Sequence, residues 1–104
     1  MVADMAIQVD LANLFYTIEQ NEAKASLEYK DKIVMVNVYA QEINDDHFNY
    51  MTTEMGITKN INVYLPTSDL AKLSKNEQVC IVGQVWSVQS WGFILFNAFI
   101  VDAD

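Results

Sequence analysis

Residues 21–36 read Asn21-Glu22-Ala23-Lys24-Ala25-Ser26-Leu27-Glu28-Tyr29-Lys30-Asp31-Lys32-Ile33-Val34-Met35-Val36. The first half is typical of a helix, because alanine, leucine, glutamate and lysine favour that conformation. From Asp31 the period changes to two and β-branched residues follow, as in a strand. The stretch therefore predicts a helix that runs into a strand without a long loop.

The strand that begins here has apolar side chains on both faces. Val34, Val36, Val38 and Ala40 alternate with Ile33, Met35, Asn37 and Tyr39. An exposed sheet face would show polar residues at every second position. This strand is therefore expected to be central or covered by another element.

A helical segment over residues 10–30 precedes the strand, after a lead-in of residues 1–9. Asp10 is a good N-cap, and apolar residues recur behind it at spacings of three and four, at Leu11, Leu14, Phe15 and Ile18. Asn21 could cap a second helix. The pattern allows either one kinked helix or two short ones.

Strand and turn signals follow in order. Turn residues at 44–46 precede an alternating run at 47–52, which is expected to form a hairpin with the first strand. Residues 60–65 form an amphipathic strand that ends at Pro66. Residues 67–73 predict a short helix, and residues 78–88 and 93–101 predict a final hairpin.

This order predicts a mainly β fold, a single domain over residues 1–104 with a barrel over 31–102. A helical segment, three strands, a short helix and two strands match a five-stranded oligonucleotide/oligosaccharide-binding (OB) barrel, with its short helix between strands three and four. The alternation predicts these core residues: Val34, Val36, Val38, Ile61, Val63, Leu65, Ile81 and Leu95.

Residues 21–36, together with Leu70-Ala71-Lys72-Leu73-Ser74-Lys75-Asn76-Glu77-Gln78-Val79 and Val82-Gly83, resemble the tRNA-anti-like family of OB-fold proteins. The resemblance covers about residues 10–102. Asn37 and Asn76 stand where relatives tend to have glycine, and asparagine tolerates positive φ better than most residues. The resemblance implies an OB fold and, by analogy with that fold, nucleic-acid binding.

The charge of the chain points to a different partner. Fourteen carboxylates face six lysines and no arginine, which gives a net charge of −8 at pH 7. Nucleic-acid affinity comes largely from basic residues that neutralise phosphates. An acidic surface repels nucleic acid and anionic lipid and favours basic partners, although it also serves solubility alone.

No catalytic or metal-binding constellation can be assembled from the sequence. His47, the single histidine, follows Asp45 and Asp46 at a turn, where a solvated polar residue is the ordinary outcome. Cys80, the single cysteine, lies in an apolar run and is expected to be a buried, unreactive core residue. We expect no enzyme activity, no cofactor and no metal site.

Aromatic residues supply the candidate binding surfaces. Tyr39, Phe48, Tyr50 and Tyr64 fall on the first three strands, and Trp86 and Trp91 lie near the last hairpin. Most aromatic residues of a small domain are core residues. Exposed ones could anchor a protein partner or stack on the bases of a single strand. Tyr64, opposite in parity to its core neighbours, is the best candidate for an exposed ring.

The sequence predicts a non-catalytic binding module for a protein with a basic surface, an adaptor or acidic inhibitor. The alternative is single-stranded nucleic-acid binding through the aromatic face, with Lys24, Lys30, Lys32 and Lys59 as its basic residues. The N-terminus lacks the features of a signal peptide or membrane span, which predicts a cytoplasmic protein. A secreted protein or lipoprotein without its leader would look the same.

Overall fold

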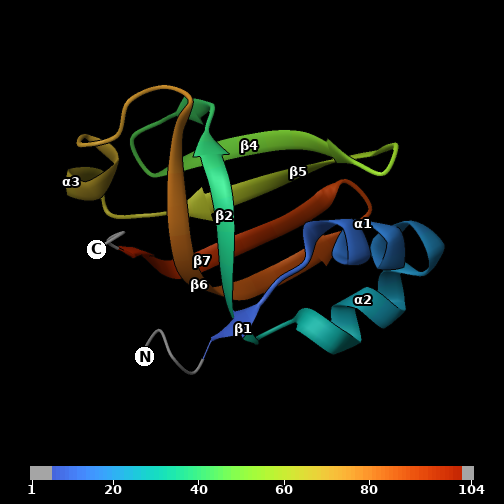
Figure 1. Ribbon diagram of the computed structural model, residues 1–104. Coiled ribbons are helices and arrows are strands. Elements are labelled where there is room, and N and C mark those ends of the chain that lie inside the picture. The colour runs from blue at the N-terminus through green and yellow to red at the C-terminus, as the bar shows by residue number, and fades with distance from the viewer. Residues whose placement is uncertain (1–5, 102–104) are drawn as a thin grey trace.

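A computed structural model describes residues 6–101 (Figure 1). Seven strands form one sheet in the order β1-β2-β6-β7-β5-β4-β3. The strands are β1 (Ile7–Gln8), β2 (Ile33–Ala40), β3 (Glu42–Ile43), β4 (His47–Glu54), β5 (Ile57–Tyr64), β6 (Glu77–Gln89) and β7 (Gly92–Val101). The helices are α1 (Leu11–Gln20), α2 (Glu22–Tyr29) and α3 (Thr67–Leu70).

The segment before β2 forms two helices, and Asn21 separates them. Asp10 caps α1, with its side chain accepting from the backbone N–H of Ala12. The backbone N–H of Asn21 donates to Thr17, which ends α1, while its side chain accepts from the N–H of Lys24 in α2. An extended backbone at Asn21 lets one residue end a helix and cap the next.

The pairing of β2 differs from the expected hairpin. β2 pairs antiparallel with β6 and parallel with β1, whereas β4 pairs with β5 and with the two-residue β3. Since Gln41 alone separates β2 from β3, the chain bends there and only β3 reaches β4. The predicted hairpin between the first strand and β4 is thus wrong, because only Glu42–Ile43, beyond that strand, pairs with β4. The sheet is not closed, so the five-stranded barrel is not confirmed.

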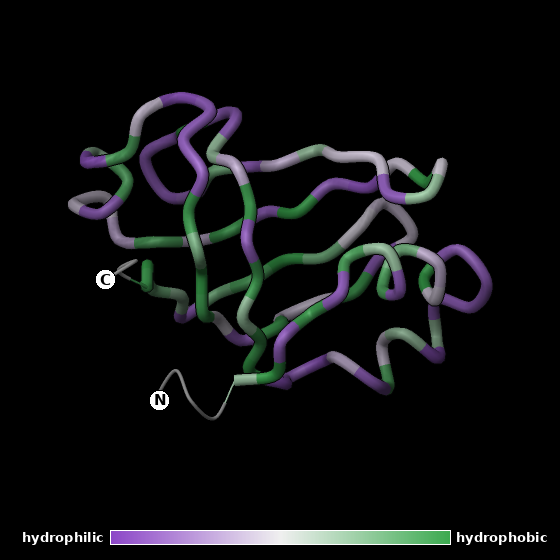
Figure 2. Tube along the Cα trace, in the orientation of Figure 1, coloured by the Kyte–Doolittle hydropathy of each residue, from purple (hydrophilic) through white to green (hydrophobic). Residues whose placement is uncertain are grey.

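The core lies between the curved sheet and the first two helices. All eight residues predicted from the alternation are buried. In α1 the stripe of Leu14, Phe15 and Ile18 is buried as well, and Figure 2 shows apolar positions along the strands. The period of two therefore identified the inward side of β2 and β5.

Two asparagines were expected to relieve backbone strain, and one of them does. Asn76 has a φ of 67° in the turn before β6. Asn37 is not among the non-glycine residues of positive φ in the described chain. It lies opposite Cys80 in a regular antiparallel ladder, where no left-handed conformation is needed. The strain argument is wrong at Asn37.

The short helix α3 follows β5, as expected, but it is a single turn. It spans four residues rather than the predicted 67–73. Pro66 precedes it, and the hydroxyl of Thr67 donates to the carbonyl oxygen of Asp45 at 2.6 Å. This contact ties α3 to the turn between β3 and β4.

Candidate binding surfaces

Two tyrosines from different strands, β2 and β4, contact each other although these strands are not hydrogen-bonded to each other. Tyr39 of β2 is 41% exposed, and its ring centroid lies 5.7 Å from that of Tyr50 in β4, with the planes tilted by 49°. Tyr50 also packs against the core. Beside them the Gln41 side chain bonds both the N–H and the C=O of Met51. The core packing of Tyr50 and the hydrogen bonds of Gln41 therefore hold this aromatic surface in place.

Two glutamates lie on the strands next to this aromatic pair. Glu77 is opposite Ala40, one residue from Tyr39, and Glu42 is opposite Asn49, one residue from Tyr50. Both glutamates are exposed. Lys75 lies close by and lines a hollow of about 310 Å³ with Glu42. We call Tyr39, Tyr50, Glu42 and Glu77 the tyrosine surface.

Phe48 and Tyr64, two of the predicted binding residues, make contacts within the chain. Phe48 is fully buried, so it is a core residue and the prediction of a binding role is wrong. Its parity with the inward Val63, opposite it in β5, explains this placement. Tyr64 is half-buried and stacks on His47, with ring centroids 4.8 Å apart.

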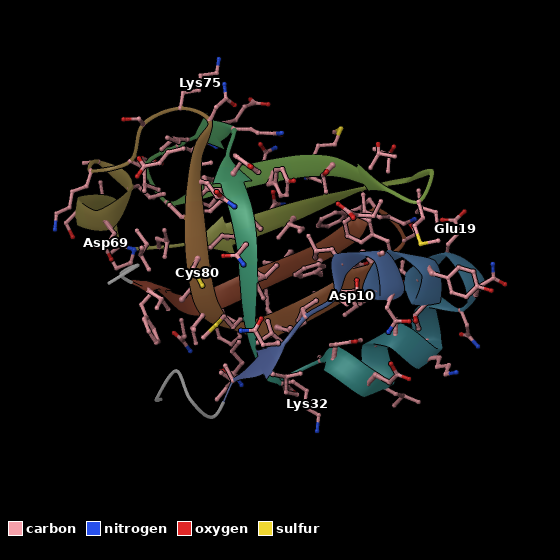
Figure 3. The ribbon with its side chains drawn as sticks, viewed as in Figure 1. Asp10, Glu19, Lys32, Asp69, Lys75 and Cys80 are labelled. Carbon is pink, nitrogen blue, oxygen red and sulfur yellow. The ribbon has the colours of Figure 1, made fainter. Side chains whose placement is uncertain are left out.

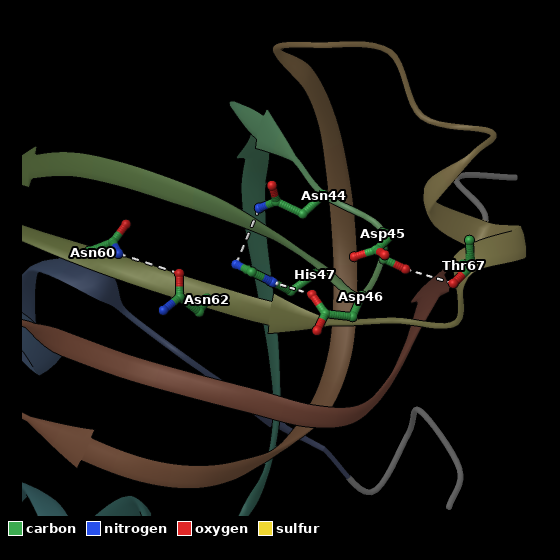
Figure 4. A network of polar contacts seen from close by, with 7 residues as sticks. All are labelled: Asn44, Asp45, Asp46, His47, Asn60, Asn62 and Thr67. Carbon is green, nitrogen blue, oxygen red and sulfur yellow. Dashed lines mark hydrogen bonds and ion pairs between the residues drawn. The ribbon is translucent and has the colours of Figure 1, made fainter.

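His47 belongs to a polar network at the start of β4 (Figure 4). Its Nδ1 lies 2.6 Å from Asp46 Oδ1, and its Nε2 lies 3.3 Å from the amide nitrogen of Asn44. Both partners come from the β3–β4 turn. The histidine thus orders a turn, and no nucleophile is among these contacts.

The tryptophans lie on a separate surface. Trp86 is 55% exposed, and its ring packs at 6.4 Å from Phe96. It borders a groove of about 510 Å³ with one face of α2, formed by Glu22, Ser26 and Lys30. Trp91 is 41% exposed and does not line this groove. The two indoles therefore offer separate contacts.

The lysines of the nucleic-acid alternative do not form a basic patch. Lys59 is 8% exposed, and its Nζ bonds Glu19 and the Ser90 carbonyl oxygen. Lys32 precedes β2, whereas Lys75 lies at the far end of that strand, where Asn76 N–H bonds Ala40 (Figure 3). The eight residues of β2 span about 26 Å, so Lys32 and Lys75 are too far apart to form one basic patch.

The remaining lysines are offset by acids. Residues 22–32 contain Lys24, Lys30 and Lys32, together with Glu22, Glu28 and Asp31. Three charges of each sign give this segment no net charge. A phosphate chain would meet as many carboxylates as ammonium groups here.

One hollow was not foreseen from the sequence. Tyr16 of α1 and Met55 and Ile57 of the β4–β5 hairpin line a space of about 630 Å³. Tyr16 and Met55 are 56% and 87% exposed. Tyr16 falls outside the apolar stripe of α1, which was the available signal. That it meets the hairpin tip depends on tertiary packing.

Cys80 is half-buried and not part of the buried core, so the prediction of a buried thiol is wrong. Val79 and Ile81 point to the core, and Cys80 between them points outward, opposite Asn37. The run was read as fully buried although a strand alternates its sides. Within residues 6–101 no three His, Cys, Asp or Glu side chains converge on a metal site.

These features define a class, a small mainly β domain whose exposed aromatic residues stand on a curved sheet. The chain belongs to the tRNA_anti-like family, which matches residues 2–100. The resemblance of residues 21–36 and 70–83 to that family is thus confirmed. No curated protein matches the chain. Among residues 6–101 no helix is long and apolar enough to cross a bilayer.

The fold is similar to a crystal structure from Klebsiella pneumoniae subsp. pneumoniae MGH 78578. That protein is described as a "putative nucleic acid-binding lipoprotein". The TM-score is 0.70 at 24% sequence identity, over 93% of this chain and 92% of that one. At this identity the likeness concerns the fold.

Proposed function

We propose that this protein is a non-catalytic binding module that engages a basic surface of a protein partner through its tyrosine surface. The observation that carries the proposal is the contact between the exposed Tyr39 and the half-buried Tyr50, with the exposed Glu42 and Glu77 on the neighbouring strands β3 and β6. A chain of net charge −8 attracts such a partner over long range.

The chemistry of the tyrosine surface suits an arginine or lysine side chain. A cation over the face of an exposed tyrosine gains about 0.5–1 kcal/mol. Arginine adds charge-assisted hydrogen bonds when a carboxylate lies within reach. Glu42 and Glu77 supply these carboxylates on two different strands. The tyrosine rings and the glutamate carboxylates of this surface could therefore both contribute to binding a basic loop or peptide.

Single-stranded nucleic-acid binding is the second candidate. The OB association of the family and the description of the Klebsiella protein favour it, as do Tyr39 and Trp86, whose rings are exposed for stacking. The layout of the lysines opposes it, since Lys59 is paired and the others are scattered or offset.

The description of the Klebsiella protein as a lipoprotein also supports a secreted or anchored location beside the cytoplasmic prediction.

The test measures binding of an acetylated, amidated peptide, Ala-Arg-Ala-Arg-Ala, by fluorescence anisotropy. We expect Tyr39→Ala to weaken binding about 2- to 5-fold, the equivalent of about 0.5–1 kcal/mol. Glu42→Gln with Glu77→Gln should weaken it further. Tyr16→Ala removes an exposed tyrosine from α1, 56% exposed against 41% for Tyr39, and is the matched control. Equal losses in the Tyr39 and Tyr16 variants would contradict the proposal.

A further inference from the structure

β7 has an unpaired edge over its C-terminal half. On one side it pairs with β6 along most of its length, from Gly92 to Val101. On the other side β5 pairs with residues 92–95 alone. β5 ends at Tyr64, and Pro66 begins the path into α3. In the described chain, no backbone hydrogen bond joins residues 96–101 to anything other than β6.

The other strands of this sheet have their edges shortened or filled. β1 and β3 are two residues long. Where β4 extends past β3, the Gln41 side chain occupies the N–H and C=O of Met51. Between β2 and β4 the Tyr39 and Tyr50 rings fill the space. Folded proteins commonly protect their edges in such ways.

The β7 edge has few of these protections. Residues 96–101 read Phe-Asn-Ala-Phe-Ile-Val, without charge or proline. A bulge places Asn97 at a φ of 48°, and beyond it the ladder is regular from Phe99 to Val101. Phe99 and Val101 are half-exposed on the outer face, beside the buried Val82. Backbone groups and apolar side chains are thus both offered to a neighbouring strand.

We propose that an extended segment of a protein partner adds as a strand to the edge of β7 between Phe96 and Val101. Main-chain hydrogen bonds supply the affinity in this mode of recognition, and pockets for alternate side chains supply the specificity. The inference rests on the proposed function for the kind of partner, and it adds a second contact, at the β7 edge, beside the tyrosine surface.

Charge selects the segment. Glu77 and Val101 line one hollow of about 410 Å³, so a carboxylate lies near the C-terminal end of the β7 edge. A β-forming segment that ends in lysine or arginine complements this carboxylate and the net charge of −8. A second copy of the chain also carries −8 and is repelled. The occupant is therefore a basic, extended segment of another protein.

Amide hydrogen exchange tests the edge itself. In the free protein, the amides of residues 99–101 that point away from β6 should exchange about as fast as those of the loops, because these N–H groups have no partner. Amides that bond β6 should stay protected. Uniform protection of these residues would overturn the proposal, because the edge would then be occupied already.

The binding test adds an acetylated, amidated peptide, Thr-Val-Thr-Val-Thr-Lys-Lys. At half occupancy we expect the fast β7 amides to slow about twofold. The same peptide with N-methyl groups on every second residue, in both registers, is the control, and one register should abolish the effect. Replacing its lysines by glutamates should weaken binding.

Several outcomes would overturn strand addition. These are no slowing at β7, equal slowing with all methylated peptides, concentration-dependent dimers that protect β7, or protection by an oligonucleotide. The proposed function is judged separately, by the Tyr39→Ala variant and the arginine peptide. Loss of one result leaves the other intact.

Discussion

Lys59 lies in β5 with its Nζ 2.7 Å from Glu19 Oε1 and 2.6 Å from the carbonyl oxygen of Ser90. The three residues come from α1, β5 and the β6–β7 turn. A buried ammonium group needs such partners, because its desolvation is costly. Glu19 remains about half-exposed, so the two ends of the pair are not equivalent.

We predict that Glu19→Gln destabilises the fold by about 1–3 kcal/mol. The buried ammonium group of Lys59 loses its charged partner and keeps the uncharged Ser90 carbonyl oxygen. Urea unfolding gives the free energy. Lys72→Gln is the control, since Lys72 is exposed and should change stability by less than about 0.5 kcal/mol. Equal stability of the Glu19 variant and the wild type would show that the pair contributes nothing.

The fold raises the pKa of Tyr29. Burial raises the pKa of its phenol, the carboxylates of Glu28 and Asp10 raise it further, and a hydrogen bond with Asn13 partly opposes them. The folded pKa thus exceeds the unfolded one. The resulting stabilisation is complete below about pH 10, the unfolded value, and is lost as pH rises through the folded pKa.

Tyr29→Phe should therefore reduce the loss of stability between about pH 9 and pH 11, on either side of the unfolded pKa. Urea unfolding at the two pH values measures it. Tyr16→Phe, at an exposed site, should leave the alkaline loss unchanged. The explanation fails if both variants lose stability as the wild type does.

At the scale of elements, the start of β7 depends on Gly92. Its φ is 144°, and a Cβ built there would lie 1.7 Å from the carbonyl oxygen of Asn60. This close approach begins the parallel pairing of β5 with β7, next to the hydrogen bond from Asn60 N–H to Trp91. A side chain would have to push the two strands apart.

Gly92→Ala is expected to destabilise the protein by more than about 3 kcal/mol, from the clash and the strained backbone together. Thermal or urea unfolding measures the change. Gly56→Ala is the matched control, because its φ is 82° but nothing lies within 4 Å of the added Cβ. It should cost about 1–2 kcal/mol. Similar costs at both sites would show that the approach to Asn60 is unimportant.

For the whole molecule, the arrangement of charge supports the proposal of a protein partner over that of a nucleic acid. Lys32 and Lys75 lie at opposite ends of β2, and Lys59 is paired inside. No arginine is present to bind phosphate in the bidentate manner. Exposed rings without clustered cations favour a partner that brings its own positive charge.

We predict that an oligothymidylate of about 12 nucleotides, within the site size of an OB fold, binds more weakly than about 100 µM at 0.15 M salt. Fluorescence anisotropy measures this affinity. Changing Lys24, Lys30 and Lys32 together to glutamine should have little effect on the peptide ligands. Tight, salt-sensitive oligonucleotide binding that this triple variant abolishes would favour nucleic acid instead.

Much of the fold could be predicted, whereas the surfaces could be predicted only in part. Asp10 and Asn21 identified the helix boundaries, and the alternation around Val36 identified the core. Tyr39 and Trp86 are exposed, as their candidacy required. Phe48 was misplaced because its inward side follows from its pairing with Val63, and Cys80 because the apolar run around it was read as buried on both faces.

By itself the sequence determined the type and order of the helices and of the five longer strands, and the inward side of most of those strands, because caps, turns and alternation act between near neighbours in the chain. The two-residue strands β1 and β3 were not predicted. Only the tertiary structure decided that β2 pairs with β6, that Lys59 meets Glu19, and that Tyr39 lies beside Tyr50. These contacts join residues far apart in sequence. Strand bending and loop paths bring them together, and local preferences do not specify either.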